Sequence, residues 1–190
     1  MNIIYIPTEI RNLVINLLTD TNYPSYGQLA TVSADNYPHV RTVHFRYSEA
    51  FGTLVCACNT ESSKWNDLTK NPRASGCIFS HEQLVQLRWE STTKLVDAHT
   101  STREEQELLT MLWNQMRPDV RRAYLLEVSQ EEKSLKNPCP TLGAIIMYPT
   151  LWDIYTLGAL NYGDGKRFVY TLTHNTWDKK QVSIISSKFF

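Results

Sequence analysis

The chain has 190 residues, of which 42% are hydrophobic and 20% charged, values typical of a globular protein with a sizeable core. Nineteen basic residues balance nineteen acidic ones, so no overall field would attract nucleic acid or an anionic membrane, and neither is expected as a partner. No low-complexity segment or shift in composition divides the chain, and we expect one domain over residues 1–190.

The N-terminal segment predicts a helix that covers one end of a sheet. Its apolar residues recur at helical spacing after Pro7 and Thr8: Ile10, Leu13, Val14, Leu17 and Leu18. Arg11 and Asn12 interrupt this apolar stretch and no basic region precedes it, which argues against a signal peptide and a membrane span. We therefore expect a cytoplasmic protein.

From Gly27 onward the hydrophobic pattern has a period of two, which indicates strands. Strands are expected at 28–33, 39–47, 53–58 and 74–79, with turns at 34–38 and 48–52. A short helix at about 62–70 interrupts the run and must end before Pro72. Residues 83–98 are long enough for one bent strand.

Helical character returns over residues 100–126, where Pro118 should separate two helices. A loop is expected at 130–140, followed by three or four strands over 142–185 with a turn at 161–165. At least six strands without strand–helix alternation predict a mainly β fold, a β-barrel of antiparallel strands with helical insertions.

Several familiar catalytic and metal-binding patterns are absent from the sequence. The five histidines form no ligand cluster, and there is no Ser-His-Asp order, phosphate-binding glycine loop or dinucleotide fingerprint. Four cysteines could in principle bind a metal or form disulfides, but a single Cys56–Cys58 pair is a weak zinc signal. We expect reduced, partly buried cysteines and no metal site.

The strand around residues 41–46 carries the first candidate site residue. Alternation places Arg41 on one face with Val43 and Phe45, where an unpaired guanidinium would be costly. Arg41 therefore needs an anion beside it, and that anion is either a carboxylate of the protein or a ligand.

A second candidate site begins where the strand 53–58 leads into the short helix. Ser62, Ser63 and Lys64 combine two hydroxyls and a cation with the free backbone N–H groups of a helix start, which favour an anion. The alternative is an ordinary N-cap by Ser62 and a solvated Lys64. Because this helix start and Arg41 lie on neighbouring strands, both could face one phosphate.

Two further polar residues, Gln86 and Arg88, share a face of the long strand 83–98. They could hydrogen-bond a heterocycle, or Arg88 could pair with Glu90.

The order of these segments resembles the pyridoxamine 5'-phosphate oxidase family. The resemblance is strongest over residues 27–90 and rests on 29–32, 38–43, Asn59 with 62–64, 71–75 and Gln86. It implies an FMN-binding split barrel of antiparallel Greek-key type. It also implies a homodimer with the FMN sites at the subunit interface.

The same resemblance implies which residues hold the cofactor. Arg41 and Lys64 would bind the FMN phosphate beside Ser62 and Ser63, with Ser63 standing where the family often has Arg. The backbone of four residues would line the isoalloxazine ring: Thr42, Val43, His44 and Phe45.

Further cofactor contacts are implied on either side of this strand. Arg46 would take a place often held by Lys, and Ala57 and Cys58 would lie beside the ribityl chain. Gln86 would reach the cofactor from the second subunit. Near the C-terminus, Tyr155 and Arg167 would touch the flavin.

The substrate positions depart from the family pattern. True oxidases of the family hold the substrate phosphate through a Tyr, an Arg and a Ser around an Arg-Pro segment. Arg117 before Pro118 fits this pattern and is the substrate-binding candidate, but Trp113 and Arg121 stand in the other two places. The C-terminal Arg-x-His substrate motif has no counterpart before Arg167.

These features together favour an FMN-dependent oxidoreductase, in which the flavin carries the chemistry and no side chain must act as a nucleophile. Three alternatives stay open: a genuine pyridoxamine or pyridoxine 5'-phosphate oxidase, a non-catalytic flavin binder, and a haem-handling split barrel.

Overall fold

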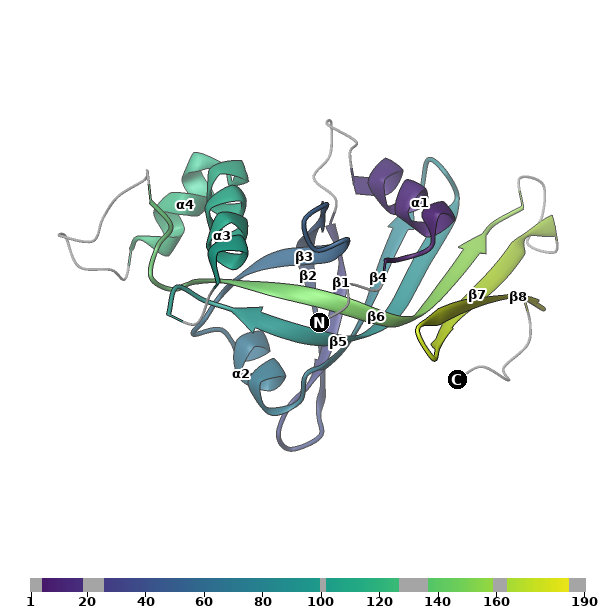
Figure 1. The fold of residues 1–190 in the computed structure, drawn as a ribbon, viewed down its shortest axis with the longest axis horizontal. Coiled ribbons are helices and arrows are strands. Elements are labelled where there is room, and N and C mark those ends of the chain that lie inside the picture. The colour runs from purple at the N-terminus through teal and green to yellow at the C-terminus, as the bar shows by residue number, and fades with distance from the viewer. Residues whose placement is uncertain (1–4, 19–25, 100–101, 127–136, 159–163, 185–190) are drawn as a thin grey trace.

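Eight strands and four helices form the described part of the computed structural model, which covers residues 5–18, 26–99, 102–126, 137–158 and 164–184 (Figure 1). The helices are α1 (Thr8–Leu18), α2 (Ser63–Lys70), α3 (Arg103–Gln115) and α4 (Pro118–Tyr124). The strands are β1 (Tyr26–Val32), β2 (Pro38–Ser48), β3 (Thr53–Asn59), β4 (Arg73–Ser80), β5 (Val85–Val96), β6 (Leu142–Thr156), β7 (Lys166–Thr173) and β8 (Thr176–Val182).

Six of the strands close into an antiparallel barrel. They follow the order β3-β2-β1-β4-β5-β6, and β3 also pairs with β6, which completes the ring. Because β4 pairs with β1 after the meander β1-β2-β3, the connection is a Greek key. The expected mainly β barrel with helical insertions is confirmed.

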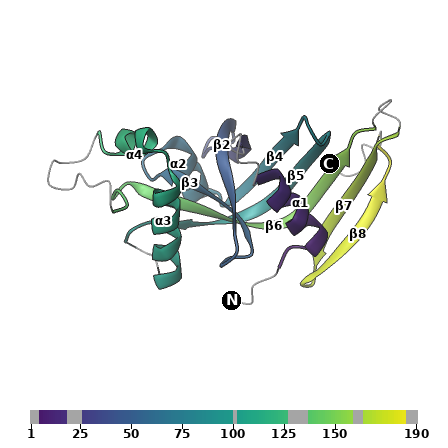
Figure 2. The same cartoon turned by 90° about the horizontal axis from the view of Figure 1, so that it is seen from above.

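Strand β6 belongs to the barrel along only part of its length. One edge of β6 pairs with β5 from Ala144 to Thr156. The other edge pairs with β3 over Leu142–Ile146 and with β7 over Leu151–Thr156. The β7–β8 hairpin therefore extends away from the closed ring, and Figures 1 and 2 show it at the opposite end of the long axis from α3 and α4.

Successive side chains of each strand point alternately inward and outward, and large inward-pointing side chains fill the barrel. Phe45, Trp89 and Trp152 are at most 1% exposed, and their rings contact one another edge-on or tilted. A Cβ added at Gly76 would lie 2.1 Å from the Trp89 indole, so the glycine allows this tryptophan to pack against β4. The buried Ile10 and Val14 of α1 and Leu68 of α2 join the same core.

A second, smaller core lies outside the ring. Leu108, Leu112 and Trp113 of α3 pack against Val55 of β3 and Ile146 of β6. The apolar positions of the helical region 100–126 therefore cover the outer face of β3 and β6, and α4 begins at Pro118 as the sequence predicts.

Most other predicted elements are also confirmed, with boundaries shifted by one to three residues. The long strand is β5, whose register with β6 shifts between Glu90 and Ser91, where Thr150 of β6 is the extra residue of a β-bulge. The predicted turn 161–165 and loop 130–140 fall mostly outside the described residues. Within the described ranges, no helix combines the length and the apolar character needed to cross a membrane.

Candidate functional site

The pairing between β2 and β3 ends partway along both strands. Their register runs from Ser48–Thr53 to Phe45–Cys56 and stops there. Beyond that point β2 pairs only with β1, while Ala57 and Cys58 of β3 pair only with β6. The backbone of Thr42 to His44 therefore has no ladder partner on the side of β3, and Ala57 and Cys58 lie across from it.

Helix α2 begins immediately after this opening. Ser62 occupies its N-cap position, but the Ser62 side chain makes no cap hydrogen bond. Its Oγ instead donates to the carbonyl oxygen of Asn59 at 2.6 Å and lies 3.2 Å from the Sγ of Cys58. The expected alternative of an ordinary Ser62 cap is therefore wrong, and the first backbone N–H groups of α2 are left without that acceptor.

Lys64 lies in the first turn of α2 and is partly buried. Within the described residues it forms no ion pair with a carboxylate. Burial raises the pKa of the Cys58 thiol, while the positive charges of Lys64 and Arg41 act in the opposite direction. The two cations that the sequence singled out therefore lie close to one sulfur atom.

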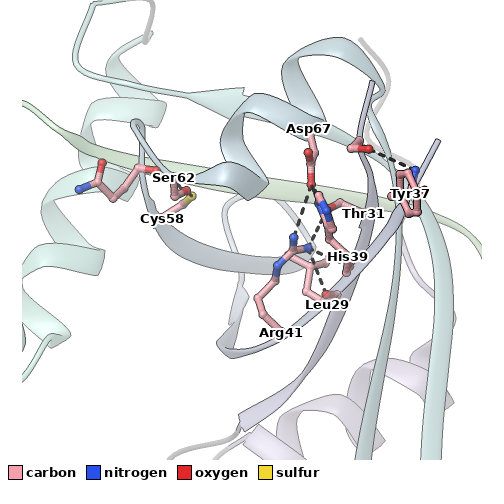
Figure 3. Close-up of polar contacts among 10 residues, drawn as sticks. Leu29, Thr31, Tyr37, His39, Arg41, Cys58, Ser62 and Asp67 are labelled. Atoms are coloured by element: carbon pink, nitrogen blue, oxygen red, sulfur yellow. Dashed lines mark hydrogen bonds and ion pairs between the residues drawn. The ribbon is translucent and has the colours of Figure 1, made fainter. Parts of the chain in front are cut away.

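Arg41 is held by a polar cluster at the end of the barrel covered by α2 (Figure 3). Its Nη1 donates to Thr31 Oγ1 at 2.6 Å, to the carbonyl oxygen of His39 at 3.1 Å and to that of Leu29 at 3.3 Å. Its Nη2 lies 3.4 Å from Asp67 Oδ2. The anion expected beside Arg41 is thus present within the protein, as a carboxylate of α2.

Asp67 is a buried carboxylate that accepts three hydrogen bonds. Besides Arg41, Thr31 Oγ1 lies 2.6 Å and His39 Nδ1 2.9 Å from the same oxygen. Burial alone would raise the pKa of Asp67, but the hydrogen bonds from Thr31 and His39 outweigh it and lower that pKa. Asp67 is therefore charged and pairs with Arg41 at neutral pH.

The opposite face of β2 carries Thr42, His44 and Arg46. Burial, and secondly the positive charge of Arg46, lower the pKa of His44 to about 4, so this imidazole is neutral at physiological pH. Burial also lowers the pKa of Arg46, which lies near Cys56, Tyr124 and Tyr26. No carboxylate within the described part of the chain pairs with Arg46. Val43 and Phe45 point into the core, so only their backbone can contact a ligand.

Three more predicted cofactor residues form a row across β5, β6 and β7. Gln86 of β5 pairs in register with Tyr155 of β6, and Tyr155 pairs with Arg167 of β7. Arg167 is only 6% exposed and binds Asp153 through two hydrogen bonds of 2.9 and 2.8 Å. This row lies where β6 pairs with β7. Helix α2 lies well away from that pairing along the long axis in both views (Figures 1 and 2).

Asp153 also pairs with Arg88. The sequence indicated Glu90, two residues along the same strand, as the carboxylate for Arg88. The partner that the structure provides is directly opposite Arg88 on β6, a position that spacing within one strand could not indicate.

The predicted substrate position is on the surface and away from this row. Arg117 pairs with Asp119 at 2.8 Å, and both side chains are more than half exposed. Trp113, which stands where the family has a substrate-binding side chain, is fully buried in the second core. These two residues are therefore not brought together in one site.

The four cysteines are free, as predicted, and Cys56 and Cys58 both belong to the main core. No group of three metal-binding side chains occurs among the described residues.

An open hollow of about 360 Å³ lies on the outer face of β1, β2, β4, β5 and β6. Its lining includes Gln28, Val40, Cys77, Arg88 and Asp153. Val40 is 64% exposed, so the hollow is open to solvent at this position in the single chain.

Sequence reasoning missed three members of the cluster around Arg41, namely Thr31, His39 and Asp67. A signal existed for two of them, because His39 shares a strand face with Arg41 and Thr31 lies opposite His39 in the hairpin. Asp67 carried no such signal, since its contact with β2 depends on how α2 folds back on the barrel.

This arrangement, a six-stranded Greek-key ring with a split strand and an α2 that covers one end, is a split barrel. Residues 17–135 match the family model described as pyridoxamine 5'-phosphate oxidase, more than half of the chain. The chain therefore belongs to the pyridoxamine 5'-phosphate oxidase family. The pyridoxine/pyridoxamine 5'-phosphate oxidase of Psychrobacter arcticus is 36% identical over 78 residues, which cover 41% of this chain and 36% of that protein. The match thus spans little more than a third of the relative's length.

Two solved structures share the fold over nearly the whole chain. A pyridoxamine 5'-phosphate oxidase-related, FMN-binding protein from Nostoc punctiforme has a TM-score of 0.77 at 20% identity, covering 93% of this chain and 96% of that one. PhzG from Burkholderia lata, solved with tetrahydrophenazine-1-carboxylic acid, has a TM-score of 0.70 at 16% identity and covers 93% of each chain. At such identities the likeness extends to the fold alone.

Proposed function

We propose that this chain is an FMN-binding flavoprotein and acts as an FMN-dependent oxidoreductase, folded as one split-barrel domain over residues 1–190. The observation that carries the proposal is the start of α2. There a partly buried Lys64 without a carboxylate partner in the described residues stands beside uncapped helix N–H groups. A dianionic phosphate fits these donors, because the helix dipole and the cation both favour negative charge.

We expect the predicted site residues of β2 and β3 to contact the rest of the cofactor. The unpaired backbone edge of Thr42 to His44 offers hydrogen-bond donors and acceptors to a planar heterocycle, and Ala57 and Cys58 leave room for a linking chain between the two. The bound flavin would supply hydride or electron transfer. The protein orients it, and the positive charge of Arg46 on the same strand favours an anionic ring.

We further propose a homodimer in which Gln86, Tyr155 and Arg167 of one subunit complete the site of the other. Two facts support this assembly. In one chain these residues lie far from α2 (Figures 1 and 2), and Val40 on the outer face of the sheet is largely exposed in the single chain. The FMN-binding name of the Nostoc punctiforme relative agrees with the cofactor.

The predicted substrate positions, Arg117 and Trp113, differ in their surroundings. Arg117 is exposed and paired with Asp119 while Trp113 is buried, so these positions do not support a vitamin B6 phosphate as substrate; turnover of pyridoxamine or pyridoxine 5'-phosphate with oxygen consumption would establish such a substrate.

The first experiment is the visible absorption spectrum of the freshly purified protein, followed by release and chromatographic identification of any coloured ligand. Flavin absorbance and released FMN are expected, and the protein-bound flavin should be reduced by a nicotinamide or chemical donor and reoxidised by an added acceptor. A Soret band would indicate haem instead. Protein that neither contains nor takes up FMN contradicts the proposal, and bound FMN that exchanges electrons with no donor or acceptor leaves only a flavin binder.

A further inference from the structure

Asp67 connects the two cations of the proposed phosphate site. It lies on α2 three residues after Lys64, so the two residues lie on neighbouring turns of one helix. Its carboxylate is 5% exposed and contacts β1 through Thr31 and β2 through His39 and Arg41. The cluster therefore joins the helix that carries Lys64 to the strand that carries Arg41.

The same cluster fixes the guanidinium of Arg41. Three oxygen atoms surround Nη1, those of Thr31, His39 and Leu29, and Asp67 lies beyond Nη2. These contacts determine the plane of the group, because the donors of a guanidinium have a rigid fork geometry. Within the described residues no acceptor is found for Nε, so at least one N–H group of Arg41 is left for a ligand.

We propose that Asp67 is a positioning residue for the flavin phosphate. It holds α2 against β1 and β2 so that Arg41 and Lys64 face one phosphate. It also orients the guanidinium of Arg41 by pairing with its Nη2. This inference rests on the proposed FMN binding, and it assigns to Asp67 a role that is distinct from the contacts of the cofactor itself.

Two other roles for Asp67 make different predictions. If Asp67 only stabilised the fold, its loss would weaken all flavin binding alike. If Asp67 only competed with the phosphate for Arg41, its loss would strengthen FMN binding. A positioning role predicts a loss that depends on the phosphate, because riboflavin has the same ring and ribityl chain but no phosphate.

The test compares the dissociation constants of FMN and riboflavin for the wild-type protein and for Asp67→Asn, which keeps the shape and removes the charge. We expect FMN affinity to fall about tenfold, the equivalent of one weakened charge-assisted hydrogen bond, and riboflavin affinity to change less than about twofold. In an Arg41→Ala background the same substitution should cause a smaller further loss, because only the part of its effect that positions α2 and Lys64 remains.

Thr31→Val is the second variant, since it removes the hydroxyl that contacts both Arg41 and Asp67 while keeping the side-chain volume. It should reduce FMN affinity selectively even if Asp67→Asn does not fold. Asp178→Asn, an exposed carboxylate on β8, is the matched control and should bind both flavins as the wild type does.

Equal losses for FMN and riboflavin in Asp67→Asn and Thr31→Val, or a gain for FMN, would overturn the positioning role. A wild-type protein that binds neither flavin would instead refute the proposed function, so the two failures are distinguishable.

Discussion

At the scale of single residues, Lys64 and Arg41 have unequal surroundings although both were predicted from the sequence to bind one phosphate. Lys64 has no carboxylate partner in the described residues, whereas Arg41 already pairs with the buried Asp67. In the proposed site, removing Lys64 would remove a phosphate contact without breaking an ion pair among the described residues. Removing Arg41 also leaves a buried carboxylate without its cation, which costs stability.

We expect Lys64→Ala to weaken FMN binding by about 1.5–3 kcal/mol, the usual range for a charge-assisted contact, with little change in the free energy of unfolding. Arg41→Ala should lower both the affinity for FMN and the free energy of unfolding. Fluorescence titration with FMN and urea unfolding measure the two effects. Lys70→Ala, at the exposed C-terminal end of the same helix, is the control and should leave both unchanged. Unchanged FMN affinity in Lys64→Ala and Arg41→Ala would refute the phosphate site.

His44 gives a pH dependence with a definite sign. Its pKa in the folded protein is about 4, below the ordinary imidazole value of 6.5, because burial and Arg46 disfavour the charged form. As the pH falls, the unfolded chain takes up the proton first, so stability from this residue is present above about pH 6.5 and is lost toward pH 4.

We therefore expect His44→Gln to flatten the stability profile between these two pH values. Urea unfolding at a series of pH values measures it, with His99→Gln at an exposed position as the control. A profile for His44→Gln that is as steep as that of the wild type would show that His44 titrates normally in the folded state.

At the scale of elements, α3 is fixed to the barrel through Glu105. This side chain is 3% exposed, accepts the Thr102 N–H at 2.7 Å and pairs with Lys94 of β5. It therefore satisfies a donor at the start of the helix and ties that start to the sheet. The capping role explains why a buried glutamate is tolerated in the second core.

We expect Glu105→Ala to lower the free energy of unfolding by about 2 kcal/mol, because it removes both contacts at once. Glu105→Gln, which keeps an acceptor for the Thr102 N–H, should cost roughly half as much. The control is Glu107→Ala on the exposed face of α3, where the pair with Arg103 should contribute about 0.5 kcal/mol or less. Equal effects of the alanine substitutions at 105 and 107 would contradict the anchoring role.

At the scale of the whole molecule, the proposed cofactor residues are divided between two distant regions of one chain. The phosphate residues lie at α2, while Gln86, Tyr155 and Arg167 lie across β5, β6 and β7. A second copy that packs on the outer face of the sheet would bring the two groups together. The dimer and the cofactor should therefore depend on each other.

We expect the wild type to be a dimer by light scattering, and Val40→Glu to give a folded monomer with much weaker FMN binding. Val40 lies in the open hollow on that face and is exposed in the single chain, so the substitution disturbs no core contact. Val120→Glu on α4 is a matched control at another exposed valine and should stay dimeric. A wild-type monomer that binds FMN tightly would contradict the shared site.

The local patterns of the sequence determined most elements and the need for an anion beside Arg41. Alternating and helical periodicities depend only on neighbouring residues, and so does the alternation that places Arg41 with Val43 and Phe45. For the same reason the sequence indicated the helix start at Ser62 to Lys64.

Only the tertiary structure decided which anion Arg41 meets and where β2 and β3 part. Asp67 reaches Arg41 because α2 folds back over the end of the barrel, and Asp153 reaches Arg88 because β5 and β6 pair in one register. The β2–β3 ladder ends at Phe45 and Cys56, while β3 continues to pair with β6 as far as Asn59. Such contacts join residues far apart in the chain, and no short-range pattern encodes them, because they depend on barrel closure and strand register.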